Sequence, residues 1–204
     1  DIRETGYGEG GVDFLTSTGL EPIAIESEMV ATARSLTFGI PATTSLIVHM
    51  GSMSSVLAIV DGASLSFSYV AESGGVALTR ALAQSLSLPL PQAEEYKRTY
   101  GLDQAQVEGK VRTGLLIILN NIVGEIRKAM EYHLTSRKTR VGRIVLSGGG
   151  AYLPEFGSYL SESFGGIEVV VADPFATAKP GRGVVIPREK AVYSVAVGLS
   201  QRVF

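Results

Sequence analysis

Three consecutive glycines follow a short apolar run, and they are the strongest local indication of a ligand site. The run reads Val145-Leu146-Ser147-Gly148-Gly149-Gly150-Ala151, and a helical pattern begins soon after it. Without Cβ atoms the backbone can approach a flat base or a phosphate closely, and the following helix offers free N–H groups. The plain alternative is a tight strand-to-helix turn, but three glycines in a row favour a ligand modestly.

A second candidate is the segment His49-Met50-Gly51-Ser52-Met53-Ser54-Ser55, which separates two apolar runs. A hairpin tip made of Gly51, Ser52, Met53 and Ser54 presents backbone N–H groups and hydroxyls, which are donors that suit phosphate oxygens. Taken alone, an ordinary hairpin with small residues explains the same pattern.

The third candidate is the pair Glu94 and Lys97 within Ala93-Glu94-Glu95-Tyr96-Lys97. A spacing of three places both side chains on one helix face, where the carboxylate can accept and the ammonium can donate hydrogen bonds to ribose hydroxyls. The alternative is an exposed ion pair that contributes about 0.2–0.5 kcal/mol.

Composition excludes several other classes of site. The chain has no Cys and only two His, far apart, so disulfides, thiolate chemistry and a His-based metal site are not expected. A net charge of -2 provides no field that attracts nucleic acid. The sequence contains no Walker, Rossmann or Ser-His-Asp pattern. The basic run at 137–143 fits a solvated loop before a strand, or a surface that faces acidic lipid or an acidic partner.

Three predicted strands with tight turns between them, one marked by the hairpin signal Asp61-Gly62, imply an antiparallel ribbon on a larger sheet, and the helices and further strands that follow make an α/β domain. A hydrophobic fraction of 45% against 19% charged residues is enough for a core. The apolar run at 115–123 is broken by Asn120 and Asn121 and is too short to span a bilayer. We expect strands at 45–50, 55–60, 65–70, 144–146 and 169–171, a short extended piece at 22–25, the end of a helix at 12–18, and helices at 26–36, 75–86, 91–100, 104–134 (one kinked helix or two), 153–164 and 191–203.

Taken in order, these features resemble the second half of an actin-like ATPase, and within that superfamily the PilM family of type IV pilus assembly proteins, with FtsA-type proteins next. The resemblance runs from about Val12 to the last residue. The stretches that carry it are 19–26 (GLEPIAIE) with 31–34 (ATAR), 74–83 (GGVALTRALA), 93–101 (AEEYKRTYG), 148–154 (GGGAYLP), 172–175 (ADPF) and 196–200 (AVGLS).

The resemblance implies an α/β actin-like (ribonuclease H-like) fold, mainly subdomains 2A and 2B, with a mixed sheet flanked by helices. Residues 1–19 would be a cut end or linker plus the end of a preceding helix, and residues 20–204 the second lobe. Within that lobe, 75–140 would be the helical 2B-type insertion and 191–204 a helix returning toward the first lobe.

The resemblance also implies a ligand, ATP or ADP, with magnesium in the intact protein. Gly51, Ser52, Met53 and Ser54 would meet the β- and γ-phosphates. Glu94 and Lys97 would meet the ribose, and the three glycines at 148–150 the adenosine.

Two departures from the family pattern limit this expectation. An Asp usually opens the phosphate hairpin and supports the magnesium, and His49 stands there instead. Imidazole does not replace a carboxylate beside a hard cation, so we expect weak or no hydrolysis and assign no catalytic residue and no metal ligand. The family's first phosphate loop comes from upstream sequence, so this chain alone holds half of a site.

The resemblance implies a cytoplasmic scaffold of a type IV pilus or related type II secretion platform, peripheral to the inner membrane, that binds the tail of a PilN-type protein and other pilus platform or motor proteins. It would meet the membrane only through partners and would bind no nucleic acid, and self-association is open. The alternatives are an FtsA-like cell-division adaptor, a kinase-type enzyme of the same superfamily, and a degenerate module without nucleotide.

Overall fold

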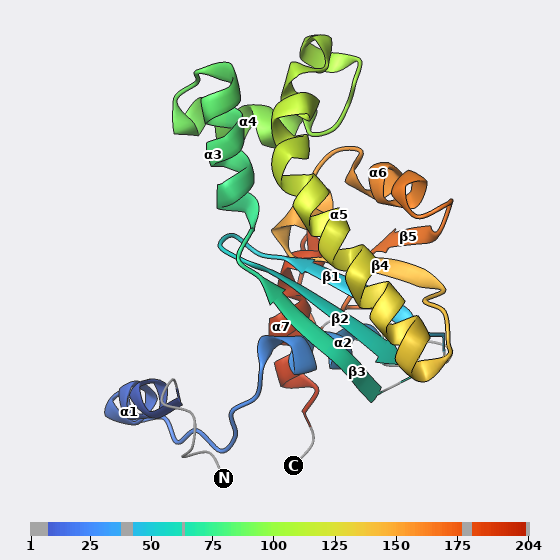
Figure 1. Cartoon of the computed structure of the whole chain (residues 1–204). Coiled ribbons are helices and arrows are strands. Elements are labelled where there is room, and N and C mark those ends of the chain that lie inside the picture. Colours follow the sequence, from blue (N-terminus) through green and yellow to red (C-terminus); the bar gives the residue numbers. More distant parts are fainter. Residues whose placement is uncertain (1–7, 38–42, 63, 177–180, 203–204) are drawn as a thin grey trace.

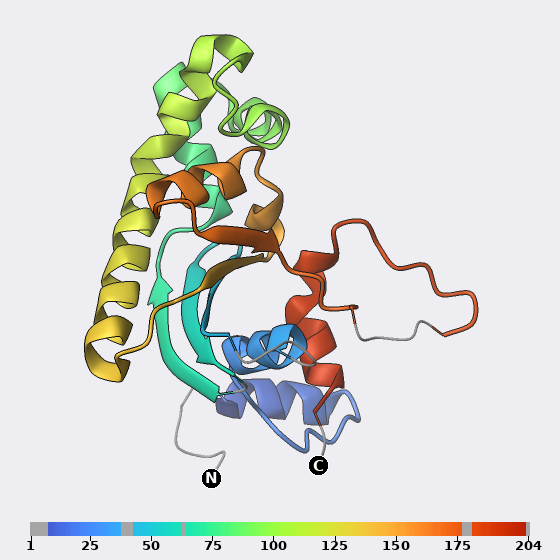
Figure 2. The ribbon, with the colours of Figure 1, turned by 90° about the vertical axis from the view of Figure 1, so that its right-hand side faces the viewer.

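The protein forms a five-stranded mixed sheet with helices on both faces (Figures 1 and 2). The computed structural model describes residues 8–37, 43–62, 64–176 and 181–202. The elements are α1 Gly8–Ser17, α2 Glu28–Thr37, β1 Ser45–Met50, β2 Ser55–Asp61, β3 Ser64–Ala71, α3 Gly75–Leu86, α4 Leu90–Tyr100, η1 Gln106–Gly109, α5 Lys110–Arg137, β4 Arg143–Ser147, η2 Gly149–Tyr152, α6 Phe156–Ser163, β5 Glu168–Val171, η3 Lys190–Tyr193 and α7 Ser194–Ser200.

The sheet has the strand order β3-β2-β1-β4-β5. The first three strands form the antiparallel meander that their tight turns predict, whereas β4 pairs parallel to both β1 and β5. β1 is central, and five of its six residues are buried. A strand covered on both faces is expected to be continuously apolar rather than alternating, which is how Leu46, Ile47 and Val48 read.

α5 covers one face of the sheet and also packs against α3, which projects beyond the strands (Figures 1 and 2). Its buried positions recur every three or four residues, so a single stripe faces the core. Gly114 lies on this stripe, and a Cβ there would come within 2.9 Å of Leu82 Cδ1 on α3. The residues of the stripe are Val111, Gly114, Leu115, Leu119, Ile122, Val123, Ile126, Ala129 and His133.

The opposite face of the sheet carries α2 and α7, which lie against each other. Gly198 permits the contact, because a Cβ at that position would lie 1.8 Å from Ala31 O. Arg34 closes it from the side by donating to Gly198 O (2.8 Å) and to both oxygens of Glu26 (2.6 Å each). The hydrogen bond from Arg34 is the main reason that the pKa of Glu26 is lowered.

Three expected helices differ from the observed ones. The helix predicted over 153–164 begins later, at Phe156, because Leu153 precedes Pro154 and takes an extended conformation, and Glu155 has φ 59°. The region 104–134 is a short 3-10 turn followed by one helix that continues through Gly114 and Gly124. At the C-terminal end, η3 precedes α7, and the last residue of the range predicted as 191–203 lies outside the described residues.

The extended piece predicted at 22–25 has no strand pairing.

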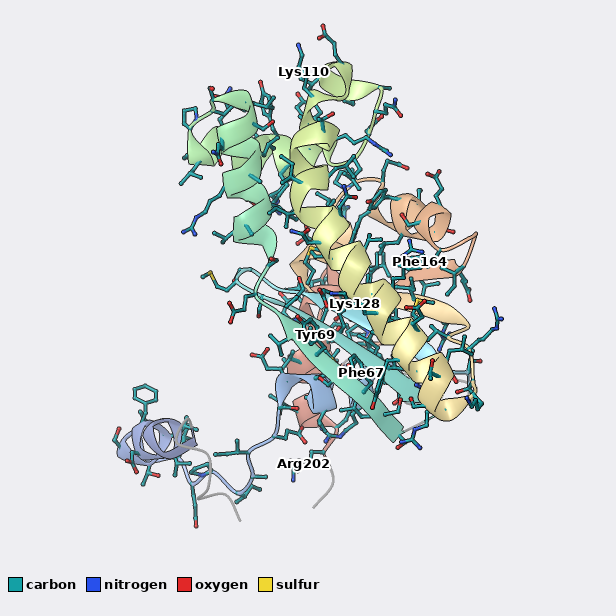
Figure 3. The ribbon with its side chains drawn as sticks, in the orientation of Figure 1. Phe67, Tyr69, Lys110, Lys128, Phe164 and Arg202 are labelled. Atoms are coloured by element: carbon teal, nitrogen blue, oxygen red, sulfur yellow. The ribbon has the colours of Figure 1, made fainter. Side chains whose placement is uncertain are left out.

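His133 is a buried histidine that bridges elements: Nε2 lies 2.9 Å from Thr139 Oγ1, and Nδ1 lies 3.4 Å from Ser66 Oγ on β3. β3 forms an edge of the sheet, where Phe67 packs its ring 5.6 Å from that of Tyr132 on α5 (Figure 3).

α1 stands apart from the sheet in Figure 1, and Phe14 on it is exposed. In the described ranges, no helix combines the length and the apolar character needed to cross a lipid bilayer.

Candidate functional site

β1 and β4 are parallel neighbours that end at the same edge of the sheet. His49 is in register with Ser147, so the hairpin after β1 and the glycine turn after β4 start side by side. The turn lies so close to β1 that a Cβ on Gly148 would be 2.5 Å from Met50 O. A Cβ on Gly150 would be 2.3 Å from Met50 Sδ. The packing of two of the glycines is therefore explained by the fold itself.

The three glycines have different surroundings. Gly148 is buried and has φ +77°, a conformation that glycine adopts without a steric penalty. Gly149 is exposed, and a Cβ there would meet nothing within 4 Å. Gly149 is thus the glycine of the turn that presents open backbone to an approaching ligand.

The hairpin tip, residues 51–54, is held by the start of α3. Gly51 N donates to Ser54 O (3.0 Å), which closes the turn. Gly75 N donates to Gly51 O and Val76 N donates to Ser52 O, both at 2.9 Å. These bonds use the N–H groups of the first two residues of α3, so this helix end supports the tip.

The same tip leaves donors open. In the described part of the chain, the N–H groups of Ser52, Met53 and Ser54 have no protein acceptor, and Met53 is 68% exposed. Consecutive free N–H groups in a turn form a concavity that binds anions such as phosphate. The tip therefore combines a fixed backbone with unused donors.

Gly74 and Gly75 belong to this site, although sequence reasoning did not assign them to it. A Cβ on Gly74 would lie 2.7 Å from both Gly51 O and Ser52 O, so the hairpin rests directly on this backbone. Ser55 Oγ adds a hydrogen bond of 2.6 Å to Ser73 O. The signal that was available is the Gly-Gly pair at the start of a helix, directly after a strand.

Lys97 is a buried support for the hairpin and not half of an exposed ion pair. The residue is 9% exposed, and its ammonium donates to Gly75 O (3.0 Å), Thr79 Oγ1 (2.9 Å) and Glu94 Oε2 (2.6 Å). An ammonium has three N–H donors, so all of them are used within the protein. Because Gly75 also holds Gly51, Lys97 connects α4 to the hairpin.

Glu94 has a more open position than its partner. Its side chain is 44% exposed, and Oε2 contacts both Lys97 and Thr79 Oγ1. Burial alone would raise the pKa of Glu94, but the hydrogen bonds from Lys97 and Thr79 and the nearby positive charges outweigh it and lower the pKa. Glu94 is therefore a charged acceptor at the surface, which suits the ribose contact predicted for it better than Lys97 does.

α4 also contacts the segment after the glycine turn. Leu102 N donates to Pro154 O (2.9 Å), and a Cβ on Gly101 would lie 2.6 Å from that oxygen. The hairpin, α4 and the glycine turn are thus joined in one connected structure, with α3 between the first two. The three segments that were predicted separately come together.

His49 faces a cluster of hydroxyls rather than open solvent. Nδ1 lies 3.1 Å from Ser147 Oγ, which lies 2.9 Å from Ser194 Oγ, and Ser194 donates to Ala191 O (2.9 Å). Burial lowers the pKa of His49 and outweighs the charge of Glu28, which acts in the opposite direction. A neutral imidazole in this position does not fit as a ligand of Mg²⁺, which takes oxygen ligands. In the described residues, no three His, Cys, Asp or Glu side chains are grouped to hold a metal.

Comparisons with solved structures give the same fold with low sequence identity. A chain of a PilM–PilN type IV pilus biogenesis complex has a TM-score of 0.79 and 23% identity, over 94% of this chain and 56% of that one. MreB 5 of Spiroplasma citri bound to AMPPNP has a TM-score of 0.71 and 18% identity, over 97% of this chain and 64% of that one. The ethanolamine utilization protein EutJ from Carboxydothermus hydrogenoformans has a TM-score of 0.68 and 19% identity, over 97% of this chain and 62% of that one.

The chain thus spans 56% to 64% of the length of these solved relatives, and their actin-like fold is its own, as predicted. No match was found among curated protein sequences. A family model described as "Type IV pilus assembly protein PilM" matches residues 11–204. Since this match covers almost the whole chain, the chain belongs to the PilM family of type IV pilus assembly proteins.

Proposed function

We propose that this chain is the nucleotide-facing part of a type IV pilus assembly scaffold and binds ATP or ADP at the edge where β1 and β4 end. The observation that carries the proposal is the hairpin tip at 51–54: in the described part of the chain the N–H groups of residues 52–54 have no protein acceptor, while Gly51 O and Ser52 O are held by α3. The open backbone of Gly149 lies on the adjacent turn. Such a pair of surfaces suits a ligand with a phosphate end and a flat end.

The predicted contacts then divide among the segments. Ser52, Met53 and Ser54 bind phosphate oxygens through backbone N–H groups and hydroxyls, with Gly51 closing the turn. Gly149 lies against the adenosine, and Gly148 and Gly150 shape its turn. Glu94 accepts from the ribose, whereas Lys97 acts by fixing the hairpin.

The nucleotide is expected to be held rather than hydrolysed efficiently. Magnesium would accompany the nucleotide in the intact protein, but His49 supplies no carboxylate for it or its waters. Since the chain spans 56% to 64% of its solved relatives, we expect further sequence to complete the site and binding by residues 1–204 alone to be weak.

The scaffold part of the proposal rests on the family. One structural relative is a PilM–PilN complex, so a PilN-type cytoplasmic tail is the expected partner, together with other pilus platform or motor proteins. The expected location is the cytoplasmic face of the inner membrane, reached through these partners. Self-association stays open.

Calorimetry with ATP and ADP in the presence of magnesium tests the nucleotide proposal. It compares the full-length protein, residues 1–204, and full-length His49→Asp. We expect binding by the full-length protein, weaker binding by residues 1–204, and hydrolysis gained in His49→Asp. Absence of binding by the full-length protein at millimolar nucleotide contradicts the proposal, because the three segments are then structural turns only.

A further inference from the structure

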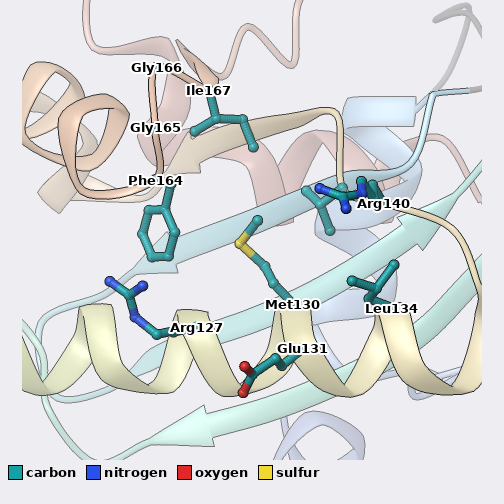
Figure 4. A pocket seen from close by; sticks show the side chains of 10 residues that line it. Arg127, Met130, Glu131, Leu134, Arg140, Phe164, Gly165, Gly166 and Ile167 are labelled. Atoms are coloured by element: carbon teal, nitrogen blue, oxygen red, sulfur yellow. The ribbon is translucent and has the colours of Figure 1, made fainter.

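A cavity of about 400 Å³ lies between the C-terminal half of α5 and the loop that joins α6 to β5 (Figure 4). None of the residues proposed to bind nucleotide lines it. Its loop precedes β5, which is an outer strand of the sheet. Met130 projects from α5 toward Ile167 in the opposite wall. Phe164 closes one end, and all three of these side chains pack partly on the core.

The wall of the cavity is shaped by two glycines. Gly165 and Gly166 have φ +72° and +85°, and a Cβ on either would meet nothing within 4 Å. Backbone bonds fix their turn, since Gly166 N donates to Ser161 O (2.8 Å) and Phe164 N donates to Leu160 O (3.1 Å). The loop is therefore set by its backbone and keeps the apolar side of the cavity open.

Two arginines stand at the ends of this apolar surface. Arg127 places Cζ 5.4 Å from the centre of the Phe164 ring, and its Nη2 lies 3.5 Å from Ser163 O. Arg140 is exposed and belongs to the segment just after α5. In the described part of the chain, neither guanidinium takes part in a salt bridge. The carboxylate of Glu131 points away from Phe164 and Ile167 (Figure 4).

We propose that this cavity binds an acidic segment of a partner protein, with a bulky apolar side chain between Met130, Phe164 and Ile167 and carboxylates on Arg127 and Arg140. Guanidinium groups bind carboxylates through two parallel hydrogen bonds, and stacking on Phe164 holds Arg127 in place beforehand. An apolar anchor in a pocket with charges at its rim is the usual division of roles in protein recognition.

Charge favours a peptide over a membrane or nucleic acid as the occupant. The chain as a whole has a net charge of -2, so it is not drawn to an extended anionic surface. The cavity accepts one or two side chains, and Arg137 and Lys138 add positive charge only around the turn after α5. Of the four cations in the basic run at 137–143, Arg140 lines the cavity. The proposal therefore gives a role to that residue of the run.

The proposal is tested by fluorescence anisotropy with a labelled probe peptide of sequence Glu-Asp-Leu-Phe-Asp-Glu. One control peptide has Ser in place of Leu and Phe, and a second has Lys in place of every acid. The full-length protein is compared with the double variant Arg127→Glu/Arg140→Glu. The matched control variant is Arg80→Glu/Arg182→Glu, which makes the same charge change at exposed positions outside the cavity. Thermal melting shows that each variant is folded.

We expect the probe to bind the wild type in preference to both control peptides. The cavity variant should lose about tenfold or more in affinity, and the control variant much less. Equal losses in both variants, or equal binding of the Ser control peptide, overturn the proposal, because binding is then set by net charge. Binding to vesicles that contain phosphatidylglycerol, lost in the cavity variant while the probe does not bind, overturns it in favour of a lipid site.

Discussion

The edge proposed to bind nucleotide and the cavity proposed to bind an acidic segment would offer different groups to their ligands: backbone N–H groups at the edge and arginine side chains in the cavity. At the nucleotide edge the side chains of Lys97 and His49 are engaged within the protein, and the backbone of residues 52–54 is left open. In the cavity the backbone of the Gly165–Gly166 turn is engaged, and the described part of the chain offers no carboxylate in a salt bridge to the side chains of Arg127 and Arg140. A fixed backbone suits a ligand of one shape, whereas arginines on long stems suit ligands that share only charge and an apolar group.

The glycines show the same difference. Gly148 is needed both for its φ and for the close approach of Met50, whereas Gly165 and Gly166 are needed for φ alone. The comparison can therefore be tested by adding a methyl group in each region.

The largest effect is expected for Gly148→Ala. A Cβ 2.5 Å from Met50 O, at φ +77°, should lower the free energy of unfolding by about 3 kcal/mol. Gly166→Ala, at φ +85° but with open space around it, should cost about 1 kcal/mol. Urea unfolding measures both. Equal losses would show that the nucleotide edge is not more tightly packed than the cavity loop.

Loss of the charged group of Lys97 should have the next largest effect. Lys97→Met leaves Gly75 O, Thr79 Oγ1 and Glu94 without their shared donor, and we expect a loss of about 2 kcal/mol. Arg127→Met, the matched change at the cavity rim, should alter stability by less than about 0.5 kcal/mol. If the two substitutions cost the same, Lys97 is not the internal support that the hydrogen bonds indicate.

A smaller effect is expected from pH through His49. Burial lowers its pKa below the ordinary 6.5, so the unfolded chain binds more protons than the folded one just below that pH. Stability should therefore fall as pH is lowered from about 7 to about 5, and His49→Asn should flatten this slope. Melting temperatures measured across the range, for both proteins, give the answer. An unchanged slope in the variant would assign the pH dependence to other groups.

The smallest effect on stability is expected at Gly149, where function should suffer most. Gly149→Leu adds a side chain in open space, so the free energy of unfolding should change by less than about 0.5 kcal/mol. The same side chain covers the backbone proposed to meet adenosine, so ADP binding by the full-length protein should be lost. Calorimetry beside urea unfolding separates the two quantities, and retained ADP binding would remove Gly149 from the site.

Most of the fold was predictable, because the spacing of apolar residues and the residue types in turns are properties of short stretches of sequence. β1 and α3 have the predicted bounds, and the Asp61-Gly62 turn joins β2 to β3 as expected. The helix predicted at 153–164 exists as α6, but its start was placed too early, because the apolar pattern continues across Pro154 while the backbone before a proline avoids the helical conformation. The pattern reported which residues face the core but not where the helix begins.

The site was predictable in position but not in the role of each residue. Spacing placed Glu94 and Lys97 on one helix face, but whether that face is exposed depends on α3, which is distant in sequence. Likewise, three glycines in a row look equivalent, and only the packing of Met50 distinguishes Gly148 and Gly150 from Gly149. Which donors remain free is a property of the tertiary contacts.

Nuclear magnetic resonance tests the central claim most directly, because it detects weak binding at individual amides. ADP is titrated into ¹⁵N-labelled protein, with Gly149→Leu as the control. We predict that the amide signals of Ser52, Met53, Ser54 and Gly149 shift most, that the signals of Gly165 and Gly166 stay unchanged, and that Gly149→Leu removes the response. Shifts that cluster elsewhere, or none at millimolar ADP in the full-length protein, would contradict nucleotide binding at the edge formed by β1 and β4.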